Sequence, residues 1–289
     1  MILVVGSTGM LGGMITRRLL AEGRQVRILV RPGSQYQPLV DAGAQPVMGD
    51  MKDRQSLDAA CQGVETVITT ANSALRGGDD NPFTVEDQGN RNLIDAAQAA
   101  GVNHFIFVSV FAADPNSPIP FIAGKGKADQ QLIQSGMTYT ILAPVAFAEV
   151  WFGVAILGPI ARGVPVMLYK GGDAKTNFIS INDVAAYAVA SVDNPAARNQ
   201  VIQLGGPQPV SYPEVVQIFH RVMGKGFDVI YLEPGTPAPT IPESVQGLYM
   251  WGSMSGTFAQ IEEQTRIFNL KQATPEEIIQ NMLAAIPAA

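Results

Sequence analysis

The sequence predicts an α/β fold, in which a doubly wound parallel sheet is followed by a smaller C-terminal lobe of mixed α/β structure. Two observations support this fold class. Short apolar runs alternate with helical patterns through the first half of the chain, as in parallel sheets that are covered on both faces. A glycine-rich turn joins the first apolar run to the first helical pattern. With 289 residues, the chain is long enough for a sheet domain and an additional lobe.

The beginning of the chain predicts a strand, a glycine turn, a helix and a second strand. Residues 2–5 and 26–30 are apolar runs, and the segment between them carries apolar side chains at helical spacing up to Gly23. Gly6 allows a sharp turn because it lacks a Cβ atom, and Gly12 allows the helix to lie close to the sheet. This arrangement is typical of the opening unit of a Rossmann-type dinucleotide-binding domain.

The glycine turn predicts where the pyrophosphate of a dinucleotide binds. Gly9 leaves room for the pyrophosphate to approach the unpaired N–H groups at the start of the helix. The spacing is GxxGxxG rather than GxGxxG, and glycine turns also occur for structural reasons alone, so the flanking strands and helix are what favour a cofactor. The residues of the turn that we expect to contact it are Gly6, Ser7, Thr8, Gly9, Met10 and Leu11.

The following elements continue the alternation. Strands are predicted at residues 45–48, 64–70, 104–110, 165–169, 178–181, 201–204 and 227–231. Helices are predicted at residues 37–42, 56–61, 85–100, 121–134, 212–223 and 246–268. Two further helices are predicted to begin at Asn182, whose own side chain caps the helix, and at Pro275. We expect residues 1–144 to form the dinucleotide-binding domain and residues 145–289 to form the substrate-binding lobe, of which the part around residues 176–193 returns to the sheet.

The carboxyl ends of the strands predict the rest of the cofactor site, because ligands of such sheets bind beyond these ends. Arg31 follows the second strand, where NAD-preferring sites usually carry an acidic residue. A guanidinium there suits the 2′-phosphate of NADP(H), since it donates a bidentate pair of hydrogen bonds, and this predicts NADP(H) in preference to NAD(H). The alternative is an ordinary surface arginine. Other strand ends add Asp50, Met51, Thr70, Ala71 and Asn72 to the expected cofactor contacts.

Several motifs carry a resemblance to a known group of proteins. They are GSTGMLG at 6–12, LVRP at 29–32, GD at 49–50, NLIDAA at 92–97, SGMTYTIL at 135–142 and FISINDVA at 178–185. They resemble the NmrA-like atypical short-chain dehydrogenase/reductases, which include isoflavone and pinoresinol-lariciresinol reductases and bacterial quinone and triphenylmethane reductases. The resemblance extends to about residue 232 and is specific to the group rather than to one substrate.

The resemblance implies a catalytic lysine on the helix at 121–134. In the reductases of this group the lysine precedes, by fourteen residues, the tyrosine of a Tyr-Thr pair in the next strand; that tyrosine is Tyr139, and the count leads to Lys125. A lysine there holds ribose hydroxyls of the cofactor and stabilises a developing oxyanion. Ser109, at the end of a strand, is expected to orient a carbonyl oxygen. The alternatives are a solvated helix lysine and a serine that only ends the strand.

Phe121 departs from the pattern of ordinary short-chain dehydrogenases, which use Tyr-x-x-x-Lys with the tyrosine as general acid. A phenyl ring cannot donate a proton, so the acid has to be another group, and Tyr139, Tyr169 and Glu149 are the candidates. The substrate pocket is expected to include Phe111, Phe121, Phe147, Glu149 and Trp151. The apolar segment that contains the last three is equally well explained as core.

Composition excludes several classes of protein. A net charge of −6 without a basic run argues against a nucleic-acid partner, and a single cysteine excludes an internal disulfide. Two histidines far apart in the chain argue against a metal site. No window is apolar for long enough to span a bilayer, so we expect a soluble cytoplasmic protein, monomer or homodimer, that acts on a small molecule without a membrane partner.

Two functions are consistent with these features. The first is an NADPH-dependent oxidoreductase that transfers hydride to a small, largely apolar quinone, enone or other carbonyl-type acceptor. The second is a non-catalytic NADP(H)-binding redox sensor, as NmrA itself is understood to be. A sensor can dispense with both the tyrosine and the lysine, whereas this chain keeps Lys125 and an apolar segment, which favours the enzyme.

Overall fold

The structure, a computed structural model, describes residues 1–74 and 76–286. The chain forms two compact units, and each unit is built from three separate segments. The sheet unit contains residues 1–143, 184–203 and 263–268. The C-terminal unit contains residues 144–183, 204–262 and the described residues from 269 onward.

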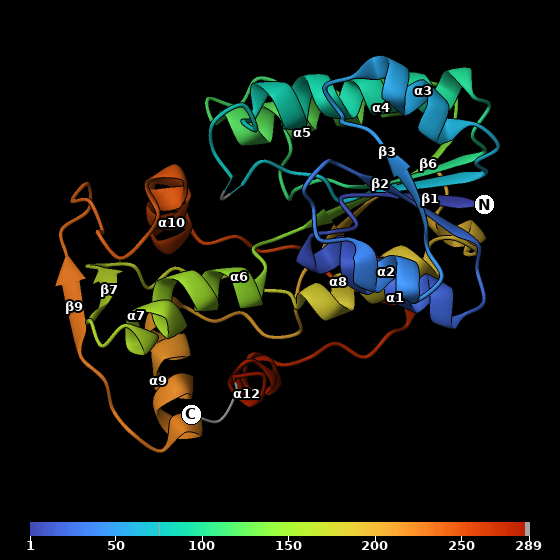
Figure 1. Ribbon diagram of the computed structural model, residues 1–289. Helices are drawn as coiled ribbons and strands as arrows, with labels where there is room; N and C mark the ends of the chain where they lie inside the picture. Colours follow the sequence, from blue (N-terminus) through green and yellow to red (C-terminus); the bar gives the residue numbers. More distant parts are fainter. Residues whose placement is uncertain (75, 287–289) are drawn as a thin grey trace. The chain divides into compact units, whose positions relative to one another are not determined.

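A seven-stranded sheet forms the centre of the sheet unit, in the order β3-β2-β1-β4-β5-β6-β8 (Figure 1). The strands from β3 to β6 pair in parallel. The strand order reverses between β1 and β4, so the crevice beyond their carboxyl ends is the position where such sheets bind ligands. The strands are β1 (Ile2–Val5), β2 (Val26–Val30), β3 (Gln45–Met48), β4 (Thr66–Thr69), β5 (His104–Val108), β6 (Thr138–Pro144) and β8 (Gln200–Leu204).

Helices cover both faces of this sheet, which confirms the predicted fold class (Figure 1). Helices α3, α4 and α5 lie over one face, and α1, α2 and α8 lie over the other. Within the described ranges, none of the helices combines the length and the apolar character that crossing a bilayer requires. The helices are α1 (Met10–Ala21), α2 (Gln37–Asp41), α3 (Arg54–Cys61), α4 (Asn90–Ala99), α5 (Pro120–Gln134), α8 (Ile181–Ala190), η3 (Pro195–Ala197) and α11 (Glu262–Phe268).

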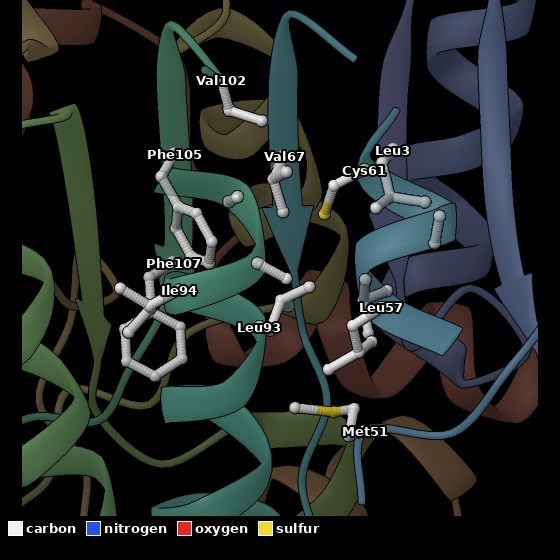
Figure 2. Packing of buried hydrophobic residues seen from close by; sticks show 14 of the residues in the cluster. Leu3, Met51, Leu57, Cys61, Val67, Leu93, Ile94, Val102, Phe105 and Phe107 are labelled. Carbon is white, nitrogen blue, oxygen red and sulfur yellow. The ribbon is translucent and has the colours of Figure 1, made fainter. Parts of the chain in front are cut away.

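One large core cluster of the sheet unit lies between the sheet and helices α3, α4 and α5. Figure 2 shows Phe105 and Phe107 on β5 beside Leu93 and Ile94 on α4, and all four side chains are fully buried. Burial of each of these large apolar side chains stabilises the fold by roughly 1.5–3 kcal/mol. Cys61 lies in the same core, and burial raises the pKa of its thiol to about 11. It is therefore a packing residue that carries little thiolate at neutral pH.

The strand predicted at residues 178–181 is wrong. In the described part of the chain only an isolated bridge forms there, and α8 already begins at Ile181. Asn182 consequently lies inside the helix and is not its cap. The Ser180 hydroxyl accepts a hydrogen bond from the Asn182 N–H at 3.1 Å, and the Glu149 carboxylate accepts one from the Ile181 N–H at 2.9 Å. These two acceptors satisfy the first N–H groups of the helix.

Two predicted helices are interrupted. The first turns of the helix predicted at 85–100 form a π-helix, η1 (Phe83–Gly89), that continues directly into α4. The helix predicted at 246–268 breaks at Gly256, which has φ +63°. A Cβ atom on Gly256 would lie 2.4 Å from the carbonyl oxygen of Lys175. Only glycine therefore fits this position, where the chain leaves the helix.

The C-terminal unit has an aromatic core. The ring centroids of Phe152 and Phe178 are 4.9 Å apart, those of Phe178 and Tyr212 5.5 Å, and those of Tyr212 and Tyr249 5.0 Å. Edge-to-face contacts of this kind add to the burial energy of the rings. The elements of the unit are α6 (Ala148–Phe152), η2 (Gly153–Leu157), α7 (Gly158–Ala161), the paired strands β7 (Val166–Tyr169) and β9 (Val229–Leu232), α9 (Tyr212–Met223), α10 (Glu243–Ser255) and α12 (Pro275–Ala284).

Candidate functional site

The glycine turn brings β1, α1 and the end of β4 close together. Gly6 has φ +85°, and a Cβ atom on it would lie 2.6 Å from Oγ1 of Thr70. A Cβ atom on Gly12 would lie 2.2 Å from the carbonyl oxygen of Gly6, so no side chain fits there. The sharp turn and the close packing predicted for these two glycines are therefore present.

The same turn contains polar groups that suit a bound diphosphate. Ser7 is fully buried, and its Oγ has no hydrogen-bond partner among the described residues. Gly9 precedes α1 and provides no side chain to satisfy the first N–H groups of the helix. Because unpaired polar groups are costly when buried, a ligand with acceptor oxygens fits this turn. Thr8 and Met10 are exposed beside it, whereas Leu11 is buried.

Residues 70–72 continue from β4 next to the turn. The Thr70 N–H donates to the carbonyl oxygen of Val5 at 3.0 Å. The Asn72 side chain folds back on its own loop, since its amide donates to the Thr70 carbonyl at 3.3 Å and its oxygen accepts from the Ala74 N–H at 3.1 Å. The predicted contact residues of β4 thus lie at the edge where β1 and β4 end.

The Lys125 ammonium lies at the carboxyl ends of β4 and β5. The residue is only 2% exposed, which rules out the alternative of a solvated helix lysine. Its Nζ donates to the carbonyl oxygens of Val108 at 2.9 Å and Ala71 at 3.2 Å, and it lies 4.6 Å from the centre of a phenylalanine ring of β5. Burial lowers the pKa of Lys125, while the negative charges of Glu86 and Asp129 oppose this shift.

Ser109 and Asp129 form a hydrogen-bonded pair beside Lys125. The Ser109 hydroxyl follows β5 and lies 2.8 Å from Oδ2 of Asp129 on α5. The other carboxyl oxygen, Oδ1, is buried without a partner among the described residues. Burial raises the pKa of Asp129 to about 7, although the hydrogen bond with Ser109 and the charge of Lys125 act in the opposite direction.

Glu86 brings a second carboxylate to this region from η1. It is fully buried and accepts hydrogen bonds from the N–H and the hydroxyl of Ser73, both at 2.7 Å. Gly124 on α5 permits the approach, because a Cβ atom there would lie 2.7 Å from Cβ of Glu86. The site therefore combines the buried Lys125 ammonium with the buried Glu86 carboxylate and the half-buried Asp129, and mutual compensation of this kind lowers the cost of burying charge.

Arg31 is paired within the chain. Its guanidinium donates to Asp80 at 2.7 Å, and Lys52 donates to the other oxygen of the same carboxylate at 2.8 Å. Asp50 lies 3.8 Å from the Arg31 guanidinium. Desolvation disfavours the ionised form of Asp80, but the hydrogen bonds from Lys52 and Arg31 outweigh it and lower its pKa to about 2. The loop that carries Asp80 is therefore tied to the end of β2.

The remaining predicted residues are divided between the two units. The Met51 side chain lies in the core of the sheet unit, so only its backbone is left for a ligand (Figure 2). The half-buried Phe111 and Phe121 also belong to the sheet unit. Phe147, Glu149 and Trp151 belong to the C-terminal unit, where the Glu149 carboxylate is engaged at the start of α8.

Four charged residues of the site were not predicted, namely Lys52, Asp80, Glu86 and Asp129. One of them had a signal in the sequence, because Asp129 follows Lys125 by four residues and thus shares a face of the predicted helix. The others depend on contacts between distant segments. No local pattern connects the loop of Asp80 with the end of β2.

Several known proteins are similar in sequence to this chain. Residues 6–195 match the family described as NAD(P)H-binding. An NAD(P)H azoreductase from Xenophilus azovorans is 31% identical over 251 residues, which cover 85% of this chain and 83% of the azoreductase. The photosystem II assembly factor Ycf39 from Cyanophora paradoxa is 31% identical over 234 residues, which cover 79% of this chain and 70% of that protein.

The fold is also similar to solved structures. An NADPH-dependent quinone oxidoreductase from Escherichia coli, complexed with NADPH, superposes with a TM-score of 0.80 at 23% identity, over 98% of this chain and 100% of that one. At this identity the similarity supports the fold alone. The match over residues 6–195 and the 31% identity with the azoreductase extend it to the family. The chain belongs to the NAD(P)H-binding family.

Proposed function

We propose that this protein is an NADPH-dependent oxidoreductase that reduces a small, largely apolar quinone, enone or related conjugated acceptor. The observation that carries this proposal is the buried Lys125 ammonium, held by the carbonyl groups at the ends of β4 and β5. These strand ends adjoin the glycine turn, whose unpaired polar groups fit a diphosphate. A nicotinamide cofactor supplies a hydride when bound.

Lys125 has two roles in this proposal. An ammonium group has three N–H donors, and within the described residues two of them bind the carbonyl oxygens of Val108 and Ala71. The third is left for a ribose hydroxyl, which fixes the orientation of the nicotinamide half. The positive charge also stabilises the oxyanion that forms on the reduced acceptor. Positioning and charge together then account for much of the rate.

Phe121 supports the proposed class of acceptor. It occupies the position of the tyrosine acid of ordinary short-chain dehydrogenases and has no proton to give. A simple ketone becomes an alkoxide, a strong base that has to be protonated as it forms. A quinone or an extended conjugated system spreads the incoming negative charge over several atoms, so it depends less on an acid in the site. The azoreductase and the quinone oxidoreductase are both named for acceptors of this conjugated kind.

Arg31 supports NADP(H) rather than NAD(H) as the cofactor. Arg31 and Lys52 already bind one compact anion, the Asp80 carboxylate, and a 2′-phosphate presents the same type of acceptor oxygens. A phosphate that binds Arg31 competes with Asp80 for the guanidinium. NADPH binding therefore includes the cost of breaking the hydrogen bond between Arg31 and Asp80. NADH lacks the phosphate and does not incur this cost.

Replacing Arg31 with alanine is expected to weaken NADPH binding by about 10–100-fold, the range that corresponds to one charge-assisted hydrogen-bonded contact. NADH binding should stay nearly unchanged, because NADH makes no contact that needs the charge. Titration of nucleotide fluorescence measures both affinities. Arg24→Ala, which removes an exposed arginine paired with Asp193, is the matched control. Equal affinities of the wild-type protein for the two cofactors would contradict the assignment.

Replacing Phe121 with tyrosine is expected to extend the range of acceptors to simple ketones, with a rise of about tenfold or more in the rate with cyclohexanone. A positioned general acid typically contributes about 10²–10⁴-fold, and the new hydroxyl takes the acid position of the ordinary pattern. Phe83→Tyr, at an exposed ring, adds the same hydroxyl elsewhere and serves as control. An unchanged ketone rate in Phe121→Tyr would show that Phe121 does not determine the class of acceptor.

A screen of NADPH oxidation against quinones, enones, azo dyes and aldehydes tests the proposed function directly. Turnover with a conjugated acceptor and none with aliphatic aldehydes is the expected result. NADPH binding without turnover of any acceptor would instead favour a non-catalytic NADP(H)-binding protein. The photosystem II assembly factor is named for a role in assembly and not for a reaction, and the similarity to it is the observation that supports this alternative.

A further inference from the structure

Asp129 is a half-buried acid that the function proposed above does not use. Its Oδ2 is 2.8 Å from the Ser109 hydroxyl, and its Oδ1 is buried with no partner among the described residues. An ionised carboxylate normally accepts several hydrogen bonds, so a single partner in a buried setting favours the neutral acid. When Asp129 is neutral, its own O–H donates to Ser109 Oγ. The Ser109 O–H is then free to donate to a different acceptor.

We propose that Asp129 and Ser109 form a relay that supplies the proton taken up by the reduced acceptor. The proposal rests on the function above and names the proton source that Phe121 cannot provide. Ser109 is the group that touches the acceptor oxygen. Asp129 acts through Ser109 and is a proton-supplying, positioning residue.

The relay balances the reduction. A hydride from the nicotinamide forms a bond to the acceptor, and an electron pair of the acceptor moves onto its carbonyl oxygen. Once the hydride has been transferred, the Ser109 O–H bond breaks and its proton goes to that oxygen, while the Asp129 O–H bond breaks and its proton goes to Ser109 Oγ. This later proton transfer suits the delocalised anion of a quinone, whereas a ketone alkoxide has to be protonated as it forms. A quinone thus gains one hydride and one proton. Asp129 is left as a carboxylate and takes a proton from water before the next turnover.

The charges around the pair fit a proton exchange near neutral pH. Lys125 faces it from the same helix, and Glu86 faces Lys125 from η1. On the exposed side of α5, Lys127 pairs with Asp87 of η1, which also pairs with Arg91 of α4. Burial raises the pKa of Asp129 to about 7, so the acid retains its proton up to neutral pH. The adjacent ammonium favours the carboxylate that remains after proton transfer.

The other acids considered from the sequence are placed less well. Tyr139 lies near the amino end of β6, in register with Phe105, whereas Ser109 follows the carboxyl end of β5. The Tyr169 hydroxyl donates to the carbonyl oxygen of Thr236 at 3.0 Å. Both oxygens of Glu149 accept hydrogen bonds at the start of α8. The pair of Ser109 and Asp129 therefore carries the assignment.

The test compares the pH dependence of kcat for reduction of a water-soluble benzoquinone by NADPH. Asp129→Asn keeps the shape of the side chain but cannot release a proton, and Ser109→Ala removes the relaying hydroxyl. Asp58→Asn, at an exposed carboxylate paired with Arg54, is the matched control. The wild-type rate is expected to fall as pH rises through about 7, because the neutral acid is lost.

Asp129→Asn is expected to lower kcat about tenfold at pH 6, below the about 10²–10⁴-fold of an acid in direct contact, because water partly replaces the relay. Its profile should be flat between pH 6 and 8, with KM for NADPH unchanged. The double variant with Ser109→Ala should be no slower than either single variant, as expected for residues that act as a unit. A merely structural role of Asp129 would leave the wild-type pH profile in place.

A second measurement separates this relay from the proposed function. The folded-state pKa of Asp129 lies above its usual value, so the wild-type protein binds more protons when folded and loses stability as pH rises from about 4 to 7. Asp129→Asn should therefore gain in Tm relative to the wild type over this interval. If the wild-type protein reduces the quinone and Asp129→Asn has the same pH profile of kcat as the wild type, the relay is overturned but the proposed function is not. NADPH binding with no turnover of any quinone would overturn the proposed function and the relay with it.

Discussion

Replacing Lys125 with methionine is expected to lower kcat for NADPH-dependent quinone reduction by about 100-fold, the effect of removing one preorganised charge contact from an active site. Methionine fills the space of the lysine stem over the phenylalanine ring of β5 but carries no charge. The carbonyl groups of Val108 and Ala71 lose their ammonium donor in the variant. Steady-state kinetics with a quinone, together with NADPH titration, measures catalysis and binding separately.

Lys127→Met provides the matched control, since Lys127 lies two residues further on the same helix and pairs with Asp87 at the surface. Its loss should change kcat by less than about twofold, because exposed ion pairs contribute little. A Lys125→Met variant that keeps at least half of the wild-type turnover would show that the buried ammonium only supports the structure. Lys125→Ala should lose as much activity as Lys125→Met if the charge is the relevant feature.

Replacing Gly12 with alanine is expected to destabilise the protein by about 3 kcal/mol, the upper end of the usual cost of overpacking, and to abolish NADPH binding. The new Cβ atom would lie 2.2 Å from the carbonyl oxygen of Gly6 and 2.8 Å from Oγ1 of Thr70. Relief of these contacts requires α1 to move away from β1 and β4, which opens the close packing between the helix and the sheet. Denaturant unfolding measures the loss of stability, and nucleotide fluorescence measures the loss of binding.

Gly247→Ala is the control for Gly12→Ala, because a Cβ atom on Gly247 meets nothing within 4 Å and the residue lies in the helix α10. Alanine there should stabilise the protein by up to about 1 kcal/mol through its higher helix propensity. A Gly12→Ala variant that unfolds at the wild-type denaturant concentration would contradict the packing argument. It would also remove the physical reason for a glycine at this position.

The sequence was most informative where local pattern and packing agree. The strand Ile2–Val5, the helix Met10–Ala21 and the strand Val26–Val30 match their predictions within about two residues. Each is bounded by a glycine or a proline, and each buries a face that its apolar periodicity already indicates. The helix caps at Ser211 and Thr274 were predictable for the same reason, since a capping box depends on residues only three positions apart.

Long-range contacts explain what the sequence could not provide. Arg31 and Asp80 are 49 positions apart and meet only because the loop after β4 returns to the end of β2. The start of α8 was placed wrongly because the Glu149 carboxylate, 32 residues earlier, accepts a hydrogen bond from the Ile181 N–H. Local propensity contains no information about such partners. Burial, likewise, changes the pKa of Asp129 only once the surrounding elements have assembled.

The interleaving of the two units affects the order in which the chain acquires its structure during synthesis. Strand β8 completes the sheet next to β6, but residues 144–183 of the other unit are made between them. At about 5–20 residues per second, the ribosome leaves β6 as an open, largely apolar edge for several seconds. An open edge of this kind readily pairs with other chains. The nascent protein is therefore most vulnerable to aggregation just before residue 204 emerges, although its glycine turn and the other six strands of the sheet have already been made.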